Sequence, residues 1–100
     1  MTSFTLTTRA KSDLIAIARF TQDRWGLVQR NIYIKQFDEA FHILAVSPNI
    51  GKNCNYIKDG YHKFPQGGHI IFYKFTPEKP IQIIRILHKK MDVNSKFDGS

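Results

Sequence analysis

The hydrophobic residues of this 100-residue chain change their spacing once, and this change constrains the fold more than any other feature. Between about residues 9 and 46, apolar side chains recur every three or four positions, a pattern that predicts helices. Between residues 61 and 88, they alternate with polar residues or form short runs rich in β-branched and aromatic types, which predicts strands. A polar stretch from Pro48 to Gly60 separates the two parts. Helices followed by strands indicate an α+β domain.

Two helices are predicted in the first part of the chain. A short half-buried strand from Ser3 to Thr7 precedes them, and Thr7-Thr8 offers an N-cap for a helix that begins near Arg9. Gly26 is well placed to end this helix. Its apolar stripe, which we expect to face a core, consists of Leu14, Ala18, Thr21 and Trp25, flanked by Ile15 and Ile17.

The second helix starts at about Val28 and ends at Ser47-Pro48-Asn49. Because the connection between the helices is short, they must run antiparallel as a helical hairpin with one shared apolar face. The residues of the second helix at helical spacing are Tyr33, Ile34, Phe37, Phe41, Leu44 and Ala45.

Three strands are predicted after the polar stretch, at residues 61–64, 69–75 and 81–88, with turns at Gly67-Gly68 and Pro77. The order is therefore β-α-α-β-β-β. We expect the helical hairpin to cover one face of a mainly antiparallel sheet, in a single domain spanning residues 1–100. Residues 93–100 are expected to fray.

The chain is basic, with 15 Lys and Arg against 8 Asp and Glu, a formal net charge of +7 and a pI near 9.8. Most of the excess lies in residues 51–100, which carry +5. Such a charge suits an acidic partner, either nucleic acid or an acidic protein. The lone Cys54, the lack of a signal-peptide pattern and the lack of a long apolar run predict a cytoplasmic protein without a membrane segment.

Local signatures of catalysis are missing from the sequence. It has no glycine-rich phosphate loop, H-E-x-x-H motif, cysteine pair or serine nucleophile elbow. Cys54 lies in the polar stretch, where Lys52 and Lys58 could lower its pKa, but an unreactive loop cysteine is the favoured interpretation. No metal or cofactor is expected, because metal-ligand spacing is absent among His42, His62, His69 and His88.

Polar groups converge at the end of the last predicted strand. Alternation places Arg85 and Leu87 on one face and Ile86 and His88 on the other. A purely structural explanation is available: Arg85 pairs with an acidic neighbour, His88 caps the sheet, and Lys89-Lys90 form a solvated edge. For the two lysines alone, this explanation is favoured.

Several segments nevertheless resemble ParE toxins of the RelE/ParE superfamily. The similarity extends over nearly the whole chain and closes with the most specific segment, R-I-L-H-x-x-M-D. In chain order, the matching segments are Asp13-Leu14-x-x-Ile17, Trp25-Gly26, Phe41-x-x-Leu44-Ala45-x-x-Pro48-x-x-Gly51, Gly60-Tyr61-x-x-Phe64-Pro65-x-Gly67, Ile71-Phe72-Tyr73 and Ile84-Arg85-Ile86-Leu87-His88-x-x-Met91-Asp92.

This resemblance implies the toxin of a type II toxin-antitoxin system. Such a toxin inhibits DNA gyrase, blocks replication and is neutralised by a ParD-like antitoxin. The resemblance implies no enzymatic activity and no cofactor, and it implies contact with DNA only through the antitoxin or gyrase. A homodimer remains open.

The resemblance also suggests where the partners bind. The candidate target-binding residues are Arg85, His88, Lys89, Lys90, Met91 and Asp92. The candidate antitoxin-binding residues, each of which helical amphipathicity would rather place in the core, are Ile15, Phe20, Trp25 and Phe37. The loop of residues 49–59 either contacts gyrase or only crosses the end of the sheet.

The alternative function is that of the related RelE branch, which cleaves mRNA on the ribosome. Arg85 would clamp the phosphate and His88 would act as the base, with Lys63 or Lys58 nearby. This alternative ranks second because the predicted strands carry few cations, namely Lys63, Lys74 and Arg85. A plain nucleic-acid-binding module ranks third, since no platform of interleaved aromatic and basic residues is present.

Overall fold

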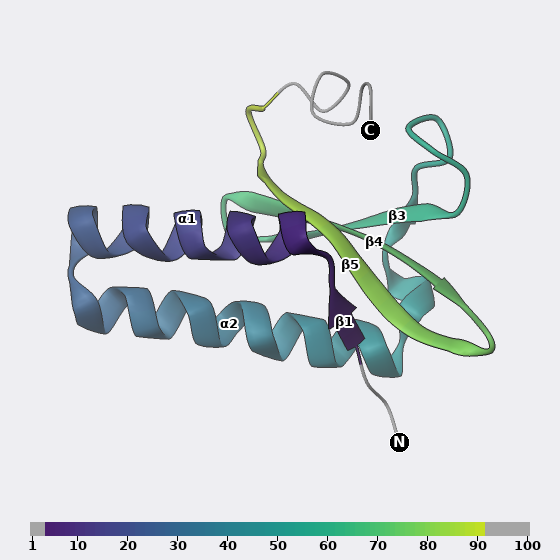
Figure 1. Ribbon diagram of the computed structural model, residues 1–100, viewed down its shortest axis with the longest axis horizontal. Helices are drawn as coiled ribbons and strands as arrows, with labels where there is room; N and C mark the ends of the chain where they lie inside the picture. Colours follow the sequence, from purple (N-terminus) through teal and green to yellow (C-terminus); the bar gives the residue numbers. More distant parts are fainter. Residues whose placement is uncertain (1–3, 92–100) are drawn as a thin grey trace.

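The computed structural model describes residues 4–91 and contains two long helices and one five-stranded sheet (Figure 1). In chain order, the elements are β1 (Phe4–Leu6), α1 (Thr8–Trp25), α2 (Leu27–Val46), the 3-10 helix η1 (Pro48–Ile50), β2 (Lys52–Asn53), β3 (Tyr61–Gln66), β4 (His69–Thr76) and β5 (Lys79–His88). The predicted α+β class and the helical hairpin are confirmed. Sequence analysis missed only η1 and the two-residue strand β2, both inside the polar stretch.

The helical hairpin begins and reverses where the sequence indicates. The Thr7 hydroxyl accepts the Ala10 N–H at 3.0 Å, which caps the first turn of α1. Gly26 alone links the helices, and its φ of +96° is open to glycine but strained for other residues. The Gly26 N–H donates to the carbonyl of Gln22 at 2.9 Å, so one residue ends α1 and starts α2.

The sheet has the order β1-β5-β4-β3-β2. The pairs β2–β3, β3–β4 and β4–β5 are antiparallel, whereas β1 runs parallel to β5 over Phe4–Leu6 and Ile81–Ile83. Because β1 is short, it pairs with only the first half of β5. Among the described residues, no strand lies beside the second half of β5, from Ile84 onward, on that side.

A register shift between β4 and β5 explains the irregular apolar pattern of β5. Phe72 pairs with Arg85, but the next residue, Tyr73, pairs with Ile83, so Ile84 is the extra residue of a bulge. Ile81, Ile83 and Ile86 belong to the core cluster on the helix side, while Leu87 belongs to the opposite one.

Most of the core lies between the hairpin and the sheet. From α2, Phe37, Phe41 and Leu44 are fully or almost fully buried there, as the helical spacing predicts. The prediction for α1 is confirmed in part, since Ile17 and Thr21 are buried as expected but Ile15 and Trp25 are exposed. Figure 1 shows the reason: the connected ends of the helices extend beyond the sheet, so the sheet does not cover the last turn of α1.

A smaller core lies on the face of the sheet that the helices leave open. It contains Cys54, Tyr61, Phe72 and Leu87, with Ile57 packed against them. The cysteine is therefore not an exposed loop thiol but is completely buried. Burial raises its pKa, and the charge of Lys63 opposes this increase only in part. The low reactivity expected of this thiol therefore follows from its burial, not from a position in a polar loop.

Candidate functional site

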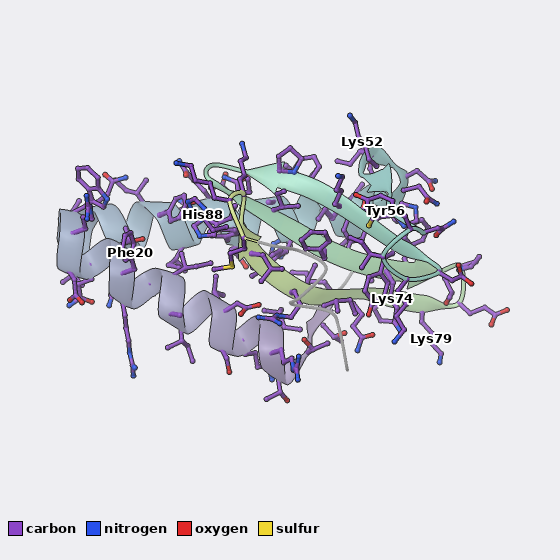
Figure 2. All side chains as sticks on the ribbon, turned by 90° about the horizontal axis from the view of Figure 1, so that it is seen from above. Phe20, Lys52, Tyr56, Lys74, Lys79 and His88 are labelled. Atoms are coloured by element: carbon purple, nitrogen blue, oxygen red, sulfur yellow. The ribbon has the colours of Figure 1, made fainter. Side chains whose placement is uncertain are left out.

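The end of the helical hairpin carries a set of exposed apolar side chains, which we call the hairpin tip. It comprises Phe20, Trp25, Leu27, Val28 and Ile32. Trp25 is 68% exposed and Phe20 is 62% exposed. Figure 2 shows Phe20 on the hairpin, far from the outer strands. Contiguous exposed apolar side chains are typical of surfaces that bind a partner.

Sequence analysis placed only part of this surface correctly. Phe20 and Trp25 were proposed for antitoxin binding although amphipathicity favoured the core, and the structure exposes both. Ile15, from the same set, is 55% exposed. Phe37 is completely buried and packs edge to face on Tyr33, so it is not available to a partner. Val28 also belongs to this exposed surface, but it was not among the antitoxin-binding residues suggested by the sequence.

A groove of about 480 Å³ leads from the hairpin tip to the end of β5. Its apolar part comes from Phe20 and Trp25, and its polar part comes from α2 and the ends of β4 and β5. Its lining residues are Phe20, Thr21, Trp25, Gln29, Tyr33, His69 and His88. The groove therefore joins the predicted antitoxin-binding and target-binding surfaces, because His88 lies in it.

The polar wall of this groove is a small network of rings. The Tyr33 hydroxyl and Nδ1 of His69 share a hydrogen bond of 2.8 Å, and the rings of His69 and His88 meet edge to face with centroids 5.3 Å apart. Burial lowers the pKa of His69, the neighbouring His88 lowers it further, and Asp13 opposes both. Burial also raises the pKa of Tyr33, against a hydrogen bond to the Gly68 backbone. The wall is therefore neutral near pH 7 at Tyr33 and His69.

The chain beyond β5 presents lysines from a fixed backbone. The Lys89 N–H donates to the carbonyl of Gly68 at 3.0 Å, the Lys90 N–H donates to Nδ1 of His88 at 3.1 Å, and the Met91 N–H donates to the carbonyl of His88 at 3.0 Å. The side chains of Lys89, Lys90 and Met91 are exposed. Asp92 and the tail predicted to fray lie outside the described residues.

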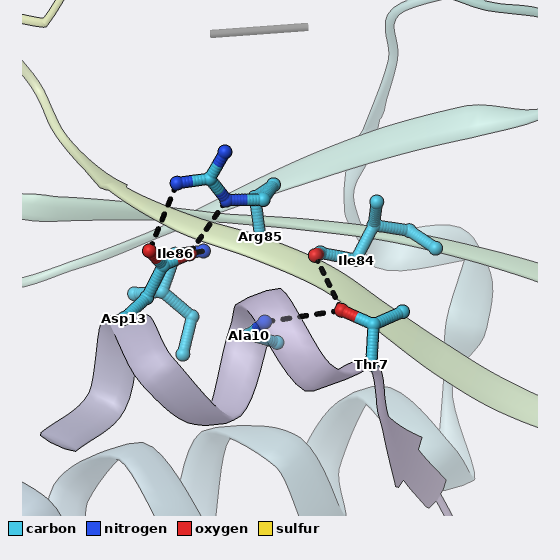
Figure 3. Close-up of polar contacts among 6 residues, drawn as sticks. All are labelled: Thr7, Ala10, Asp13, Ile84, Arg85 and Ile86. Atoms are coloured by element: carbon cyan, nitrogen blue, oxygen red, sulfur yellow. Dashed lines mark hydrogen bonds and ion pairs between the residues drawn. The ribbon is translucent and has the colours of Figure 1, made fainter. Parts of the chain in front are cut away.

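Arg85 is bound to Asp13 of α1 (Figure 3). Its Nε and second terminal nitrogen donate to the two carboxylate oxygens of Asp13 at 2.8 and 2.9 Å. Both side chains are only 15% exposed. The hydrogen bonds to Asp13 are the main reason why the pKa of Arg85 is raised. The structural explanation for this arginine is therefore confirmed, and no local sequence signal could connect residues so far apart in the chain.

Of the residues suggested for RNA cleavage, Lys58 and Arg85 line one pocket, but Lys63 and His88 lie outside it. Lys63 lies on β3 on the helix-free face and donates to the Tyr56 hydroxyl at 3.0 Å. His88 contacts His69 on the helix side, and Arg85 is held by Asp13. A base, a clamp and a second cation around one phosphate would need all three side chains on one face.

Within residues 4–91, no group of three His, Cys, Asp or Glu side chains could hold a metal ion. No helix in the same range is long and apolar enough to span a bilayer.

Comparison with known proteins identifies the family. A sequence model described as "ParE toxin of type II toxin-antitoxin system, parDE" matches residues 4–93. Toxin ParE1 of Mycobacterium tuberculosis is 37% identical over 91 residues, which cover 91% of this chain and 93% of that protein. Toxin ParE1 of Caulobacter vibrioides is 30% identical over 95 residues, covering 95% and 97% of the two chains.

A solved structure supports the fold. A chain of the structure titled "Chromosomal ParDE TA system from P. aeruginosa" superposes with a TM-score of 0.74 at 22% identity. The superposition covers 88% of this chain and 96% of the other. The family model matches residues 4–93, which include the helical hairpin and the sheet, and the two sequence relatives cover more than nine-tenths of the chain. The chain therefore belongs to the ParE toxin family of type II toxin-antitoxin systems.

Proposed function

We propose that this protein inhibits DNA gyrase, and thereby blocks replication, until a ParD-like antitoxin neutralises it. The observation that carries this proposal is the family match over residues 4–93, which includes both the hairpin tip and the basic segment after β5. The net charge of +7 supports acidic partners in both roles. Contact with DNA would then be indirect, through gyrase or the antitoxin.

The antitoxin is assigned to the hairpin tip and the adjoining groove. Each exposed aromatic side chain at the tip would gain about 2 kcal/mol when covered by apolar side chains. A disordered acidic segment that folds on binding can supply such side chains together with carboxylates. Ile15 extends the same surface along α1. Phe37 is left out because it is buried.

The target is assigned to the segment that follows β5. The backbone of Lys89, Lys90 and Met91 is held by hydrogen bonds. Binding a partner there would therefore cost little backbone conformational entropy. Asp92 completes the proposed segment, while Arg85 supports it by joining β5 to α1.

The position of His88 suggests how neutralisation works. This residue lines the groove proposed for the antitoxin and also begins the basic segment proposed for the target. An antitoxin segment in the groove would cover His88 and restrict access to the lysines beside it. Neutralisation would then be direct obstruction and would need no change in the toxin's conformation.

We assign no catalytic step to the protein. The dispersed positions of Lys63, Arg85 and His88 support inhibition by binding over a RelE-like ribonuclease. The test is supercoiling of relaxed plasmid by purified gyrase, run beside a ribosome-programmed mRNA cleavage assay with the same preparation. Lost supercoiling with intact mRNA is the expected result, and cleaved mRNA with unaffected gyrase would overturn the proposal.

A matched pair of variants tests the target surface. Lys89→Gln/Lys90→Gln should weaken gyrase inhibition by roughly tenfold if both lysines contact the target. Lys11→Gln/Lys35→Gln removes the same charge from exposed positions on α1 and α2 and should leave inhibition nearly unchanged. Equal loss in the two variants would point to net charge alone. Sedimentation of the free toxin determines whether it forms a homodimer.

A further inference from the structure

A second groove lies on the face of the sheet that the helices leave open. It has a volume of about 290 Å³ and an apolar floor formed by Ile50, Phe64, Pro65 and Ile70. Its cations are Lys52, Lys63 and Lys89. We call this the lysine groove. Figure 2 shows Lys52 beside Tyr56, well separated from the hairpin that carries Phe20.

The charges around the lysine groove are not balanced from within. Lys52 and Lys63 are direct cross-strand partners of β2 and β3, and like charges in that relation destabilise a sheet. No carboxylate lines the groove, and within residues 4–91 none of its three lysines forms an ion pair. An anionic partner would relieve this repulsion.

The Lys63 side chain and the Lys89 backbone are also held in place before any partner binds. The Lys63 ammonium donates to the Tyr56 hydroxyl at 3.0 Å and lies 5.6 Å from the centre of its ring. This hydrogen bond is the main reason why the pKa of Lys63 is raised, so the side chain stays charged. Lys89 lines the groove from the end of β5, where its backbone N–H donates to the carbonyl of Gly68.

The segment that carries Ile50 and Lys52 is anchored to the core. The Tyr73 hydroxyl accepts the Gly51 N–H at 3.0 Å and donates to the carbonyl of Pro48 at 2.7 Å. A side chain at Gly51 would collide with the Tyr73 ring, so only glycine lets the segment approach this closely. One wall of the lysine groove is therefore built by a tight, glycine-dependent contact.

We infer that the lysine groove binds an extended acidic segment of a partner protein, with an aliphatic side chain on its floor and carboxylates at Lys52, Lys63 and Lys89. The floor favours a peptide over single-stranded nucleic acid, because bases are held by stacking on exposed aromatic rings, and the one aromatic ring of the lining, Phe64, is partly buried against the core cluster on the helix side. The three ammonium groups suit carboxylates spaced along an extended chain.

Lys89 belongs to both the lysine groove and the proposed gyrase-binding segment after β5. The inference therefore extends that surface, and the identity of the partner rests on the proposed function. It adds Lys52 and Lys63, which the proposal for the segment after β5 does not include. The target contact would then extend around the end of β5 onto the helix-free face. The antitoxin groove lies on the other face of the sheet and is a separate site.

The test is fluorescence anisotropy with a labelled ten-residue peptide of alternating glutamate and leucine. A glutamine-leucine peptide and a ten-nucleotide thymidine strand serve as comparison ligands. The acidic peptide should bind tightest, and its Kd should rise with salt. The triple variant Lys52→Gln/Lys63→Gln/Lys89→Gln should raise that Kd by roughly tenfold, from modest contributions of three exposed ion pairs.

The matched control is Lys11→Gln/Lys35→Gln/Lys79→Gln, which lowers the net charge equally at exposed positions away from the groove. Circular dichroism checks that both triple variants remain folded. Equal peptide affinity in the two variants, or tighter binding of the thymidine strand, would overturn the inference.

Supercoiling assays with the same proteins separate this inference from the proposed function. If the wild-type protein binds the acidic peptide through the three lysines but does not inhibit gyrase, the groove stands and gyrase is the wrong target. If gyrase is inhibited but the two triple variants bind the peptide equally well, the function stands and the groove is wrongly assigned.

Discussion

The Asp13 carboxylate binds both the Arg85 side chain and the N–H of Ile86, so one residue of α1 closes the edge of β5 that β1 leaves open. Nearby, the Thr7 hydroxyl donates to the carbonyl of Ile84 at 2.8 Å (Figure 3). Side chains thus replace a missing strand along the second half of β5.

Removing this carboxylate should destabilise the protein more than removing an exposed one. Asp13→Ala removes the carboxylate from an ion pair whose two side chains are each only 15% exposed, and we expect the free energy of unfolding to fall by about 2–3 kcal/mol. Urea denaturation provides the measurement. Asp38→Ala, which removes an exposed carboxylate 3.6 Å from His42, is the control and should cost less than about 1 kcal/mol. Equal costs would show that Asp13 contributes no more than a surface charge.

Phe37 and Phe20 should respond in opposite ways to truncation. Phe37→Ala removes a completely buried ring and should lower the free energy of unfolding by about 3–5 kcal/mol. Phe20→Ala should change stability by less than about 0.5 kcal/mol but weaken antitoxin binding by roughly tenfold. Thermal melts and titration calorimetry with a ParD-like peptide measure the two effects. Unchanged affinity in the Phe20 variant would remove this residue from the antitoxin surface.

Trp25 offers a spectroscopic view of the hairpin tip, because it is the single tryptophan of the chain and is 68% exposed. A ParD-like peptide that covers the tip should shift its emission to shorter wavelength. The shift should disappear with Phe20→Asp, which places a charge in the apolar groove. Tight binding without any change in emission would place the antitoxin elsewhere.

His69 should make stability depend on pH near neutrality. Its pKa in the folded protein is lower than the usual value near 6.5, mainly because it is buried. As pH falls through about 6.5, the unfolded chain takes up the proton first, so the free energy of unfolding decreases. His69→Gln should flatten this dependence between pH 7.5 and 5.5 in urea titrations. His42→Gln, at an exposed site, should keep it, and the same slope in the wild type and the His69 variant would exclude His69 as the cause.

Cys54 should react slowly with thiol reagents while the protein is folded. It is fully buried and burial raises its pKa, so little thiolate is available to react. Labelling with a disulfide reagent should be at least about a hundredfold faster in urea, where the side chain is accessible. Fast labelling of the folded protein would mean that the segment of residues 54–60 opens readily.

Sequence reasoning succeeded where local chemistry determines structure. Thr7 and Gly26 marked the limits of α1 because capping and positive φ are properties of single residues. It also placed Phe37 at helical spacing. It failed at Trp25, because exposure of the last turns of α1 depends on how far the helix extends beyond the sheet, which periodicity does not encode.

The candidate sites depended even more on contacts between distant residues. The end of β5 was recognisable from its sequence, but the partner of Arg85 lies in α1 and was found only in the structure. Likewise, Lys52 and Lys89 belong to one groove only because of strand pairing and the turn at Gly68. Charge composition predicted an acidic partner but not the face that would meet it.

The parallel pairing of β1 with β5 has a consequence for synthesis of the chain on the ribosome. Phe4–Leu6 emerges before the helical hairpin, yet its pairing partner, Ile81–Ile83, emerges only after β4. The helical hairpin can form early from neighbouring residues, but closing the sheet edge requires contacts across almost the whole chain, which are slow to form. A nascent chain therefore completes its fold only when β5, and with it the basic segment that follows, has been made.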